Sequence, residues 1–305
     1  MVAPVQAAPP SFRSLLVGDG VRTHARVAPG RVALREDGRD RTYGQLAERA
    51  ARLATAVRHG LGLRSGDRTA LLAPTCIEFV EALLGLADAN TPPVILTPRA
   101  TEAELRDACE DVGARVLLVH PDHEELARAA APACVERVVV LGGPAWEQLL
   151  GQGSPAGLGL ADRPHELDTF CMLPTSGSTG RPKAVMLSHR QRALCAFAFH
   201  AVLRSYGPGD RALGISPLYH GGGLQTTIAG LLLGSTTVLV PRFDPEHALA
   251  LVERERLTSV LCVPTHVTAL LAAAEAPGAR ARDLSSLRTI GTNASPMSAA
   301  LRERV

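Results

Sequence analysis

Short runs of aliphatic and β-branched residues alternate with helix-forming segments along most of the chain, and this alternation restricts the fold more than any other feature. Two capping boxes, Thr42 with Gln45 and Thr101 with Glu104, each predict the start of a helix. We expect helices over 43–59, 102–111, 189–205, 223–233, 245–256 and 266–276. Strands are predicted over 68–72, 94–96, 115–119, 137–141, 169–173, 184–187, 212–216, 236–240 and 259–263. Such alternation is typical of an α/β fold with a largely parallel sheet.

The length of 305 residues predicts more than one folding unit, because single hydrophobic cores stop growing near this size. Segment 151–164 is rich in Gly and Pro and lacks periodicity, which predicts a linker. We therefore expect a flexible tail over 1–12, a first α/β subdomain over 13–150, a linker over 151–167 and a second α/β subdomain over 168–305. The two subdomains are expected to be doubly wound and stacked on each other.

Composition argues against several functional classes. The 32 basic and 30 acidic residues leave a net charge of +2, which does not favour a nucleic-acid-binding surface. The longest apolar stretch, 228–240, is too short and too interrupted to span a membrane, and it predicts a buried helix followed by a strand. The first ten residues lack the basic and apolar regions of a signal peptide, so we expect a cytoplasmic protein. The six cysteines form no CxxC pair, and we interpret them as small buried hydrophobes.

The chain has one lysine, Lys183, among 32 basic residues. A bias toward arginine would retain lysine only where a compact, mobile ammonium is needed. Lys183 closes the segment Thr175-Ser-Gly-Ser-Thr-Gly-Arg-Pro-Lys183 between two predicted strands. Glycines let backbone N–H groups converge on an anion and hydroxyls donate further hydrogen bonds, so the segment predicts a phosphate-binding loop. It lacks the spacing of a Walker loop or a dinucleotide fingerprint, and a polar β-hairpin turn remains the alternative.

A weaker candidate site is the segment 120–125, HPDHEE, which gathers two imidazoles and three carboxylates. One interpretation is a metal site. We favour a turn followed by the start of a helix, because acidic side chains in the first helical turn interact favourably with the helix dipole.

The loop extended to LPTSGSTGRPKAVMLSHR, residues 173–190, resembles the signature of the adenylate-forming enzymes, which include acyl- and aryl-CoA synthetases. Other segments similar to landmarks of that family occur in the same order. They are TYGQL at 42–46, GDR at 66–68, PLYHGGGL at 217–224, VPT at 263–265 and NASPMS at 293–298. The resemblance therefore covers nearly the whole chain, and it implies the large N-terminal domain of such an enzyme.

The resemblance implies an enzyme that joins a carboxylic acid to AMP, releases pyrophosphate and then passes the acyl group to the thiol of CoA or of a carrier protein. ATP and Mg²⁺ would take part in the first step. The β- and γ-phosphates of ATP would lie against Thr175, Ser176, Gly177, Ser178, Thr179 and Gly180. Lys183 is the catalytic candidate, since its charge would compensate that of the departing pyrophosphate.

By the same resemblance, His220, Gly221 and Gly222 would lie at the acyl pocket, and Ala294 and Ser295 would lie near the carboxylate and the nucleotide. For His220, a hydrogen-bonded histidine at a strand end is the alternative. The motif at 293–298 departs from the family, which has glycines at its first two positions. Asn tolerates left-handed backbone angles, whereas Ala294 would add a methyl group close to the expected ligand.

Later segments of the family have no counterpart before Val305. They are a Tyr-Gly-x-Thr-Glu segment whose Glu helps hold Mg²⁺, an Asp that binds the ribose, a β-barrel, and a C-terminal lid that carries a second lysine. We therefore expect no metal ligand in this chain, a fold without the barrel and lid, and weak or no adenylation by this chain alone.

Two hypotheses follow. The first is the N-terminal part of an AMP-forming acid–thiol ligase, which would act on a carboxylic acid together with a complementary C-terminal domain or a carrier protein. The alternative is a non-catalytic remnant that binds a nucleotide, an acyl ligand or a protein partner. An incomplete fold should leave an apolar face uncovered, so we also expect the chain to self-associate.

Overall fold

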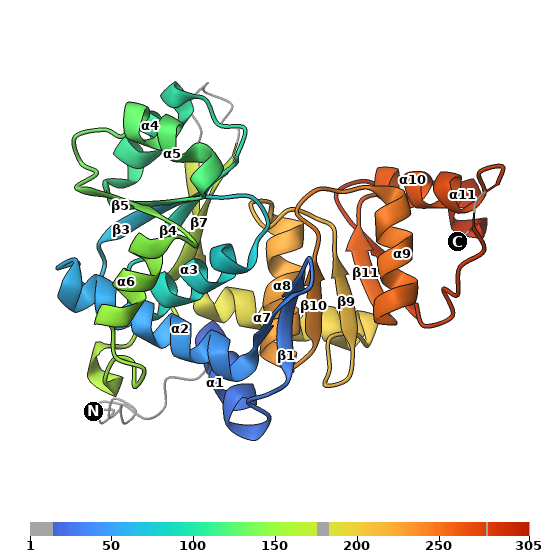
Figure 1. Cartoon of the computed structure of the whole chain (residues 1–305), viewed down its shortest axis with the longest axis horizontal. Helices are drawn as coiled ribbons and strands as arrows, with labels where there is room; N and C mark the ends of the chain where they lie inside the picture. The colour runs from blue at the N-terminus through green and yellow to red at the C-terminus, as the bar shows by residue number, and fades with distance from the viewer. Residues whose placement is uncertain (1–14, 176–182, 279, 305) are drawn as a thin grey trace, which may run out of the picture.

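The computed structural model describes residues 15–175, 183–278 and 280–304 and contains two six-stranded sheets (Figure 1). The first sheet has the order β6 (Arg137–Val140), β5 (Ala114–Val119), β3 (Arg68–Leu72), β4 (Pro93–Leu96), β7 (Thr169–Thr175) and β8 (Lys183–Ser188). The second sheet has the order β12 (Thr289–Thr292), β11 (Ser259–Cys262), β9 (Arg211–Gly214), β10 (Thr236–Leu239), β1 (Val32–Glu36) and β2 (Arg39–Thr42). Neighbouring strands are parallel except in the edge pairs β7–β8 and β1–β2, so the expected α/β class is confirmed.

Helices connect most of the strands. In the first half they are α1 (Val17–Val27), α2 (Tyr43–Thr55) with a π-helical turn η1 (Ala56–Gly60), α3 (Ile77–Asp88), α4 (Glu102–Val112), α5 (Glu124–Ala130) and α6 (Pro144–Gln152). In the second half they are α7 (His189–Leu203), α8 (Gly221–Leu233), α9 (Pro245–Glu255), α10 (Pro264–Ala274) and α11 (Ala299–Glu303). Two 3₁₀ turns, η2 (Pro121–His123) and η3 (Leu160–Asp162), complete the connections. Both capping boxes form as predicted.

Each sheet carries helices on both faces, as a doubly wound fold requires. On β3, Ala70 and Leu72 face the cluster built by α4 and α5, while Leu71 faces the cluster built by α2 and α3. In the second sheet, Val238 belongs to the cluster of α9 and α10, whereas Leu239 belongs to that of α8. Successive residues of a strand point to opposite faces, which explains this division.

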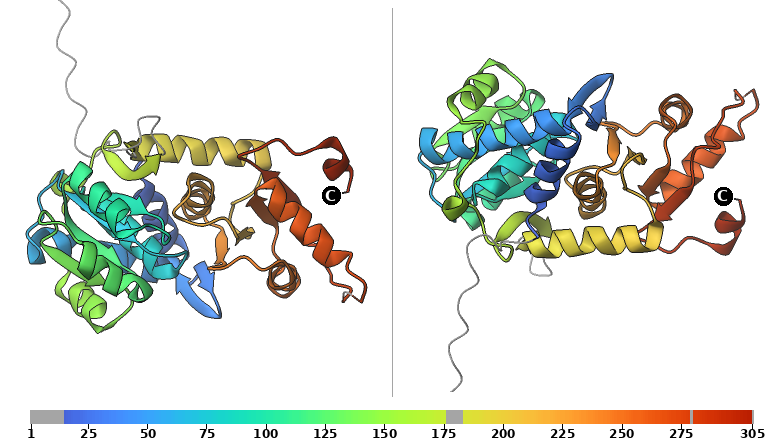
Figure 2. Two further views of the ribbon diagram at one scale, coloured as in Figure 1. Left: turned by 90° about the horizontal axis from the view of Figure 1, so that it is seen from above. Right: turned by 90° about the horizontal axis from the view of Figure 1, so that it is seen from below.

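The two sheets share one hydrophobic core. Side chains of α2 and α3, which cover the first sheet, pack in one cluster with α8 and β1 of the second sheet. Tyr43 at the start of α2 is fully buried, and its hydroxyl donates to the carbonyl oxygens of Gly230 (3.0 Å) and Ser235 (2.8 Å). Figure 2 shows α8 between the two sheets from above and below. The units are therefore stacked, as expected.

The boundary between the sheets does not coincide with the expected linker at 151–167. β1 and β2 lie in the first half of the chain but pair in the second sheet, and β7 and β8 follow the linker but pair in the first sheet. A Gly- and Pro-rich stretch indicates exposed chain, which this segment largely is. It carries no information about the sheet in which the next strand finds its hydrogen-bonding partner. The expected tail over 1–12 lies outside the described residues.

Several smaller predictions are also tested. The stretch 228–240 contains the end of α8 and all of β10, as predicted. Among the described residues, no helix is long and apolar enough to cross a membrane.

All six cysteines are free thiols, and four are buried, whereas Cys134 and Cys195 are partly exposed. At 120–125 the nitrogen Nδ1 of His120 accepts from the backbone N–H of Asp122 (3.3 Å) ahead of α5, which is the turn and helix start that we favoured.

Candidate active site

A cavity of about 830 Å³ lies where the carboxyl ends of strands from both sheets meet. Its walls include residues that follow β4 in the first sheet and residues that follow β9, β11 and β12 in the second. The start of α8, between the sheets, forms another wall. Ligands of open parallel sheets bind outside the carboxyl ends of the strands, and the volume is in the range of small-molecule sites. The cavity is therefore the candidate active site.

Four of the predicted site residues line this cavity: His220, Gly221, Gly222 and Ala294. Ser295 directly follows Ala294, and its backbone N–H donates to the carbonyl oxygen of Asn293 (2.9 Å). Pro217, Tyr219, Val263 and Asn293 belong to the landmark segments and also line the cavity. Sequence reasoning did not single out Thr97, Arg99, Glu104, Ser216, Gly223 and His266 as site residues. Most of these residues could have been found from the sequence, because they lie within a few residues of the carboxyl end of a predicted strand, where ligands of parallel sheets bind.

The predicted phosphate-binding loop connects β7 to β8. Thr175 and Lys183 stand opposite each other in the antiparallel register of these strands, and Lys183 is exposed. Ser176, Gly177, Ser178, Thr179 and Gly180 lie outside the described residues. Leu173 on β7 approaches α8 closely, because a β-carbon on Gly221 would lie 3.8 Å from its Cδ1. Leu173, two residues before Thr175, therefore lies beside the first turn of α8.

Glycines allow the first turn of α8 to approach the strand ends. A β-carbon on Gly222 would lie 2.8 Å from Nδ2 of Asn293, and one on Gly223 would overlap the carbonyl oxygen of Ser216. A side chain at Gly223 would push α8 away from the backbone that follows β9, whereas one at Gly222 would displace only the side-chain amide of Asn293. The first N–H groups of a helix have no acceptor within the helix and carry partial positive charge. The α8 N-terminus thus presents a weakly positive, unobstructed surface at the cavity.

His220 is the N-cap residue of α8 and part of the cavity wall. Its ring lies against that of Tyr219, with 4.7 Å between the centroids. Burial lowers the pKa of His220, and the positive charge of Arg99 lowers it further. The imidazole is therefore neutral near pH 7. A neutral histidine in this wall can hydrogen-bond a ligand without adding a positive charge to the cavity.

The turn after β12 differs from the expectation for the motif at 293–298. Ala294, and not Asn293, adopts the left-handed conformation, with φ of +69°. The turn places its left-handed residue one position later than we expected. An alanine in this region is strained, because its β-carbon crowds the neighbouring carbonyl oxygen. Ala294 lines the cavity, so this strain is located at the candidate site.

Metal binding by the protein itself has no support in the described part of the chain. No group of three or more His, Cys, Asp or Glu side chains there is arranged to hold a metal ion. The carboxylate in the cavity wall, Glu104, belongs to a capping box, where it accepts from the backbone N–H of Thr101 (2.8 Å). Glu104 is therefore already engaged by the protein at the start of α4.

Comparison with known proteins agrees with this geometry. A family described as AMP-binding enzyme matches residues 21–305. Over 283 residues the chain is 38% identical to a feruloyl-CoA synthase of an Amycolatopsis species, covering 92% of this chain and 54% of that protein. It is 32% identical over 290 residues to the fatty acid–[acyl-carrier-protein] ligase ScoC of Streptomyces coeruleorubidus, covering 92% and 53%. The chain thus spans about half the length of these two relatives.

Solved structures show the same fold. The inhibitor-bound N-terminal domain of FACL13 from Mycobacterium tuberculosis superposes with a TM-score of 0.85 at 26% identity, covering 95% of this chain and 72% of that one. The anthranilate CoA ligase AuaEII in complex with anthranoyl-AMP gives 0.84 at 25% identity, covering 97% and 58%. The chain belongs to the AMP-binding, adenylate-forming enzyme family, and its two sheets match the N-terminal domains of these enzymes.

Proposed function

We propose that this chain is the nucleotide- and acid-binding part of an ATP-dependent acid–thiol ligase. The observation that carries the proposal is the position of the cavity, at the carboxyl ends of strands from both sheets and against the first turn of α8, whose Gly221 lies beside Leu173 on β7. In this proposal the glycine- and hydroxyl-rich loop after β7 and the ammonium of Lys183 would act together with this cavity. The thioester-forming relatives named above support the same reaction class.

In the proposed reaction a carboxylate oxygen attacks the α-phosphorus of ATP. The bond from that phosphorus to the bridging oxygen breaks, and pyrophosphate leaves with both electrons of the bond. In the second step a thiol of CoA or of a carrier protein attacks the acyl carbon, gives up its proton and displaces AMP. Such a reaction is accelerated mainly by positioning and by compensation of phosphate charge.

The roles proposed for individual residues follow from the family resemblance of the segments that contain them. Thr175 to Gly180 would hold the β- and γ-phosphates, and Lys183 would balance the charge of departing pyrophosphate. His220, Gly221 and Gly222 would form the acyl wall, while Ala294 and Ser295 would lie near the carboxylate and nucleotide. Mg²⁺ would enter as the complex with ATP.

Titration of the 305-residue chain with Mg·ATP, followed by calorimetry, tests the phosphate-binding role. We expect Lys183→Ala to weaken binding at least about tenfold, because a charge-assisted hydrogen bond contributes about 1.5–3 kcal/mol. Arg26→Ala is the matched control, since it removes an exposed positive charge on α1, far from the cavity in sequence and in the fold. Absence of binding at millimolar ATP, or equal affinities for wild type and Lys183→Ala, would refute this role.

Carboxylate-dependent exchange of pyrophosphate into ATP tests turnover. We propose that this chain alone exchanges weakly and that a complementary domain restores the rate. If the chain binds ATP but exchanges no pyrophosphate even when a complementary domain is added, the non-catalytic alternative would be favoured. Strong exchange by the chain alone would contradict the proposed dependence on further sequence.

We also propose that the chain works in the cytoplasm and self-associates through an apolar surface on β8 and α7. Exposed side chains on these two elements support the surface: Val185 (44% exposed), Leu194 (49%), Phe197 (43%) and Val202 (80%). Scattered apolar residues are ordinary, whereas a group on adjacent elements favours contact with another surface. A monodisperse monomer in light scattering at high concentration would contradict self-association.

A further inference from the structure

A second histidine, His266, lines the same cavity as His220 but comes from a different element. It lies in the first turn of α10, which follows β11 in the second sheet. No hydrogen bond in the described structure involves its side chain, and its ring contacts Phe243, with 4.4 Å between centroids and 41° between planes. An aromatic neighbour at this distance limits the movement of the ring. The imidazole is therefore held in the wall without a polar partner from the protein.

The two ring nitrogens of His266 differ in their surroundings. Nδ1 is buried and has no hydrogen-bond partner, whereas Nε2 is not enclosed in this way. A buried N–H without an acceptor is rarer and costlier than an acceptor without a donor. The neutral tautomer that fits this site therefore carries its proton on Nε2. Burial also lowers the pKa of His266, which favours the neutral ring.

A neutral Nε2–H at a cavity wall is a hydrogen-bond donor that lacks an acceptor from the protein. The neighbours of His266 in this part of the wall are apolar: Val263 precedes α10, and Phe243 lies against the imidazole ring. Glu104, the acidic residue of the lining, comes from α4 above the first sheet. The donor is thus suited to an uncharged oxygen of a ligand.

We propose that His266 is a specificity-determining residue that donates a hydrogen bond from Nε2 to a hydroxyl, ether or carbonyl oxygen on the acyl group. The site then selects carboxylic acids with an oxygen substituent over the corresponding unsubstituted acids. This inference rests on the proposed function, because it assumes that the cavity holds the acyl group. A pocket that hydrogen-bonds a substrate oxygen discriminates strongly against an analogue that lacks it, since the donor is left unpaired.

Binding of acyl-sulfamoyl adenosines, stable analogues of the acyl adenylate, tests this inference without turnover. Three pairs, based on cinnamoyl, benzoyl and octanoyl groups, would each be prepared with and without an oxygen substituent. We expect wild type to bind the oxygenated member of at least one pair about tenfold more tightly. His266→Leu should reduce that ratio to near one and change the Kd of the unsubstituted member less than about threefold. His266→Gln, which retains a donor, should preserve part of the preference.

His247→Leu is the matched control, because this histidine is exposed on α9 and does not line the cavity. Thermal melts of all variants would confirm that they fold. Equal Kd values within every pair for wild type, or the same ratio in wild type and His266→Leu, would overturn the role of His266 and leave the proposed function standing. Failure of wild type to bind any of the six analogues would instead overturn the proposed function, and this inference with it.

Discussion

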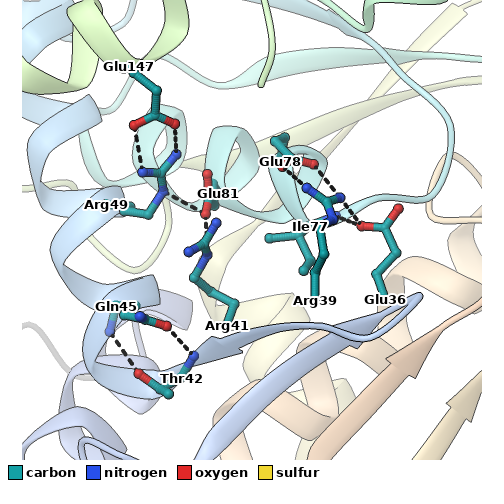
Figure 3. Close-up of polar contacts among 10 residues, drawn as sticks. All are labelled: Glu36, Arg39, Arg41, Thr42, Gln45, Arg49, Ile77, Glu78, Glu81 and Glu147. Atoms are coloured by element: carbon teal, nitrogen blue, oxygen red, sulfur yellow. Dashed lines mark hydrogen bonds and ion pairs between the residues drawn. The ribbon is translucent and has the colours of Figure 1, made fainter. Parts of the chain in front are cut away.

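Glu36 on β1 of the second sheet accepts a hydrogen bond from the backbone N–H of Ile77, the first residue of α3 on the first sheet, at 2.9 Å. A carboxylate from one sheet thus caps a helix that covers the other. Arg39 on β2 completes the contact by pairing with Glu36 and with Glu78, each at 2.7 Å (Figure 3). The β1–β2 hairpin is therefore fastened to α3 by charge as well as by packing, and this contact fixes how the sheets are stacked around the cavity.

A second ionic contact between β2, α2 and α3 is centred on Glu81 of α3. Its side chain is fully buried and its Oε1 lies 2.7 Å from Nε of both Arg41 on β2 and Arg49 on α2 (Figure 3). We expect Glu81→Gln to lower the free energy of unfolding by about 3 kcal/mol, because it leaves two arginines with a buried, uncharged partner. Urea denaturation would measure the loss. Glu48→Gln is the control, since its pair with Arg52 is exposed and should matter by less than about 1 kcal/mol. Equal stabilities of the two variants would contradict the importance of Glu81.

The close approach of α8 to β9 predicts different responses at two neighbouring glycines. Gly223→Ala should lower the free energy of unfolding by about 1–3 kcal/mol and weaken ATP or analogue binding, because the new methyl group would overlap the carbonyl oxygens of Ser216 and Pro217. Gly221→Ala places its methyl group 3.8 Å from Leu173, an ordinary contact distance, and should fold as stably as wild type. Chemical denaturation of both variants checks this contrast. Tolerance of Gly223→Ala would show that the α8 wall moves more freely than its packing indicates.

The left-handed backbone of Ala294 predicts a stabilising substitution. Ala294→Gly should raise the free energy of unfolding by about 0.5–1 kcal/mol, because glycine adopts a φ of +69° without the clash of a β-carbon. Ala250→Gly, in the interior of α9, is the control and should destabilise by about 1 kcal/mol, since glycine disfavours the helix. Thermal and urea melts would give both values. A loss of stability in Ala294→Gly would contradict the assigned strain.

The buried His189 predicts a loss of stability in mild acid. Its ring is fully buried, its Nδ1 accepts from the backbone N–H of Val17 at 3.4 Å, and burial lowers its pKa to about 4. In the unfolded chain the pKa is about 6.5. Between these values the unfolded state binds more protons, so the free energy of unfolding falls as pH falls from about 6.5 to 4, by up to about 3 kcal/mol.

Urea melts from pH 7.5 to 5 would measure this dependence. His189→Asn retains an acceptor for the N–H of Val17 but does not titrate, so its stability should change less over this range than that of wild type. His247→Asn, which alters an exposed histidine, should retain the wild-type slope. Parallel curves for wild type and His189→Asn would show that other groups cause the acid sensitivity.

Local patterns predicted most of the elements, and the failures have physical reasons. β2 has the sequence Arg39-Asp-Arg-Thr42 and shows no apolar alternation, because its side chains bind acidic residues of α3 and not a hydrophobic core. α3 is buried at every position from Ile77 to Asp88, so its sequence lacks the amphipathic period that indicates a helix. Neither element carries a local signal, since each is defined by what it packs against.

Spacing and residue type along the chain were enough to assign the family, the alternation of helices and parallel strands, and the segments that contain Lys183, His220 and Ala294. These depend on local spacing and side-chain type, which a linear pattern records. Three features appear only in the folded chain: strands from both halves share each sheet, Arg99 and His266 meet His220 at one cavity, and Ala294 is the left-handed residue. Pairing of strands and closure of a cavity depend on contacts between residues far apart in sequence, because burial and hydrogen bonding are satisfied in space and not along the chain.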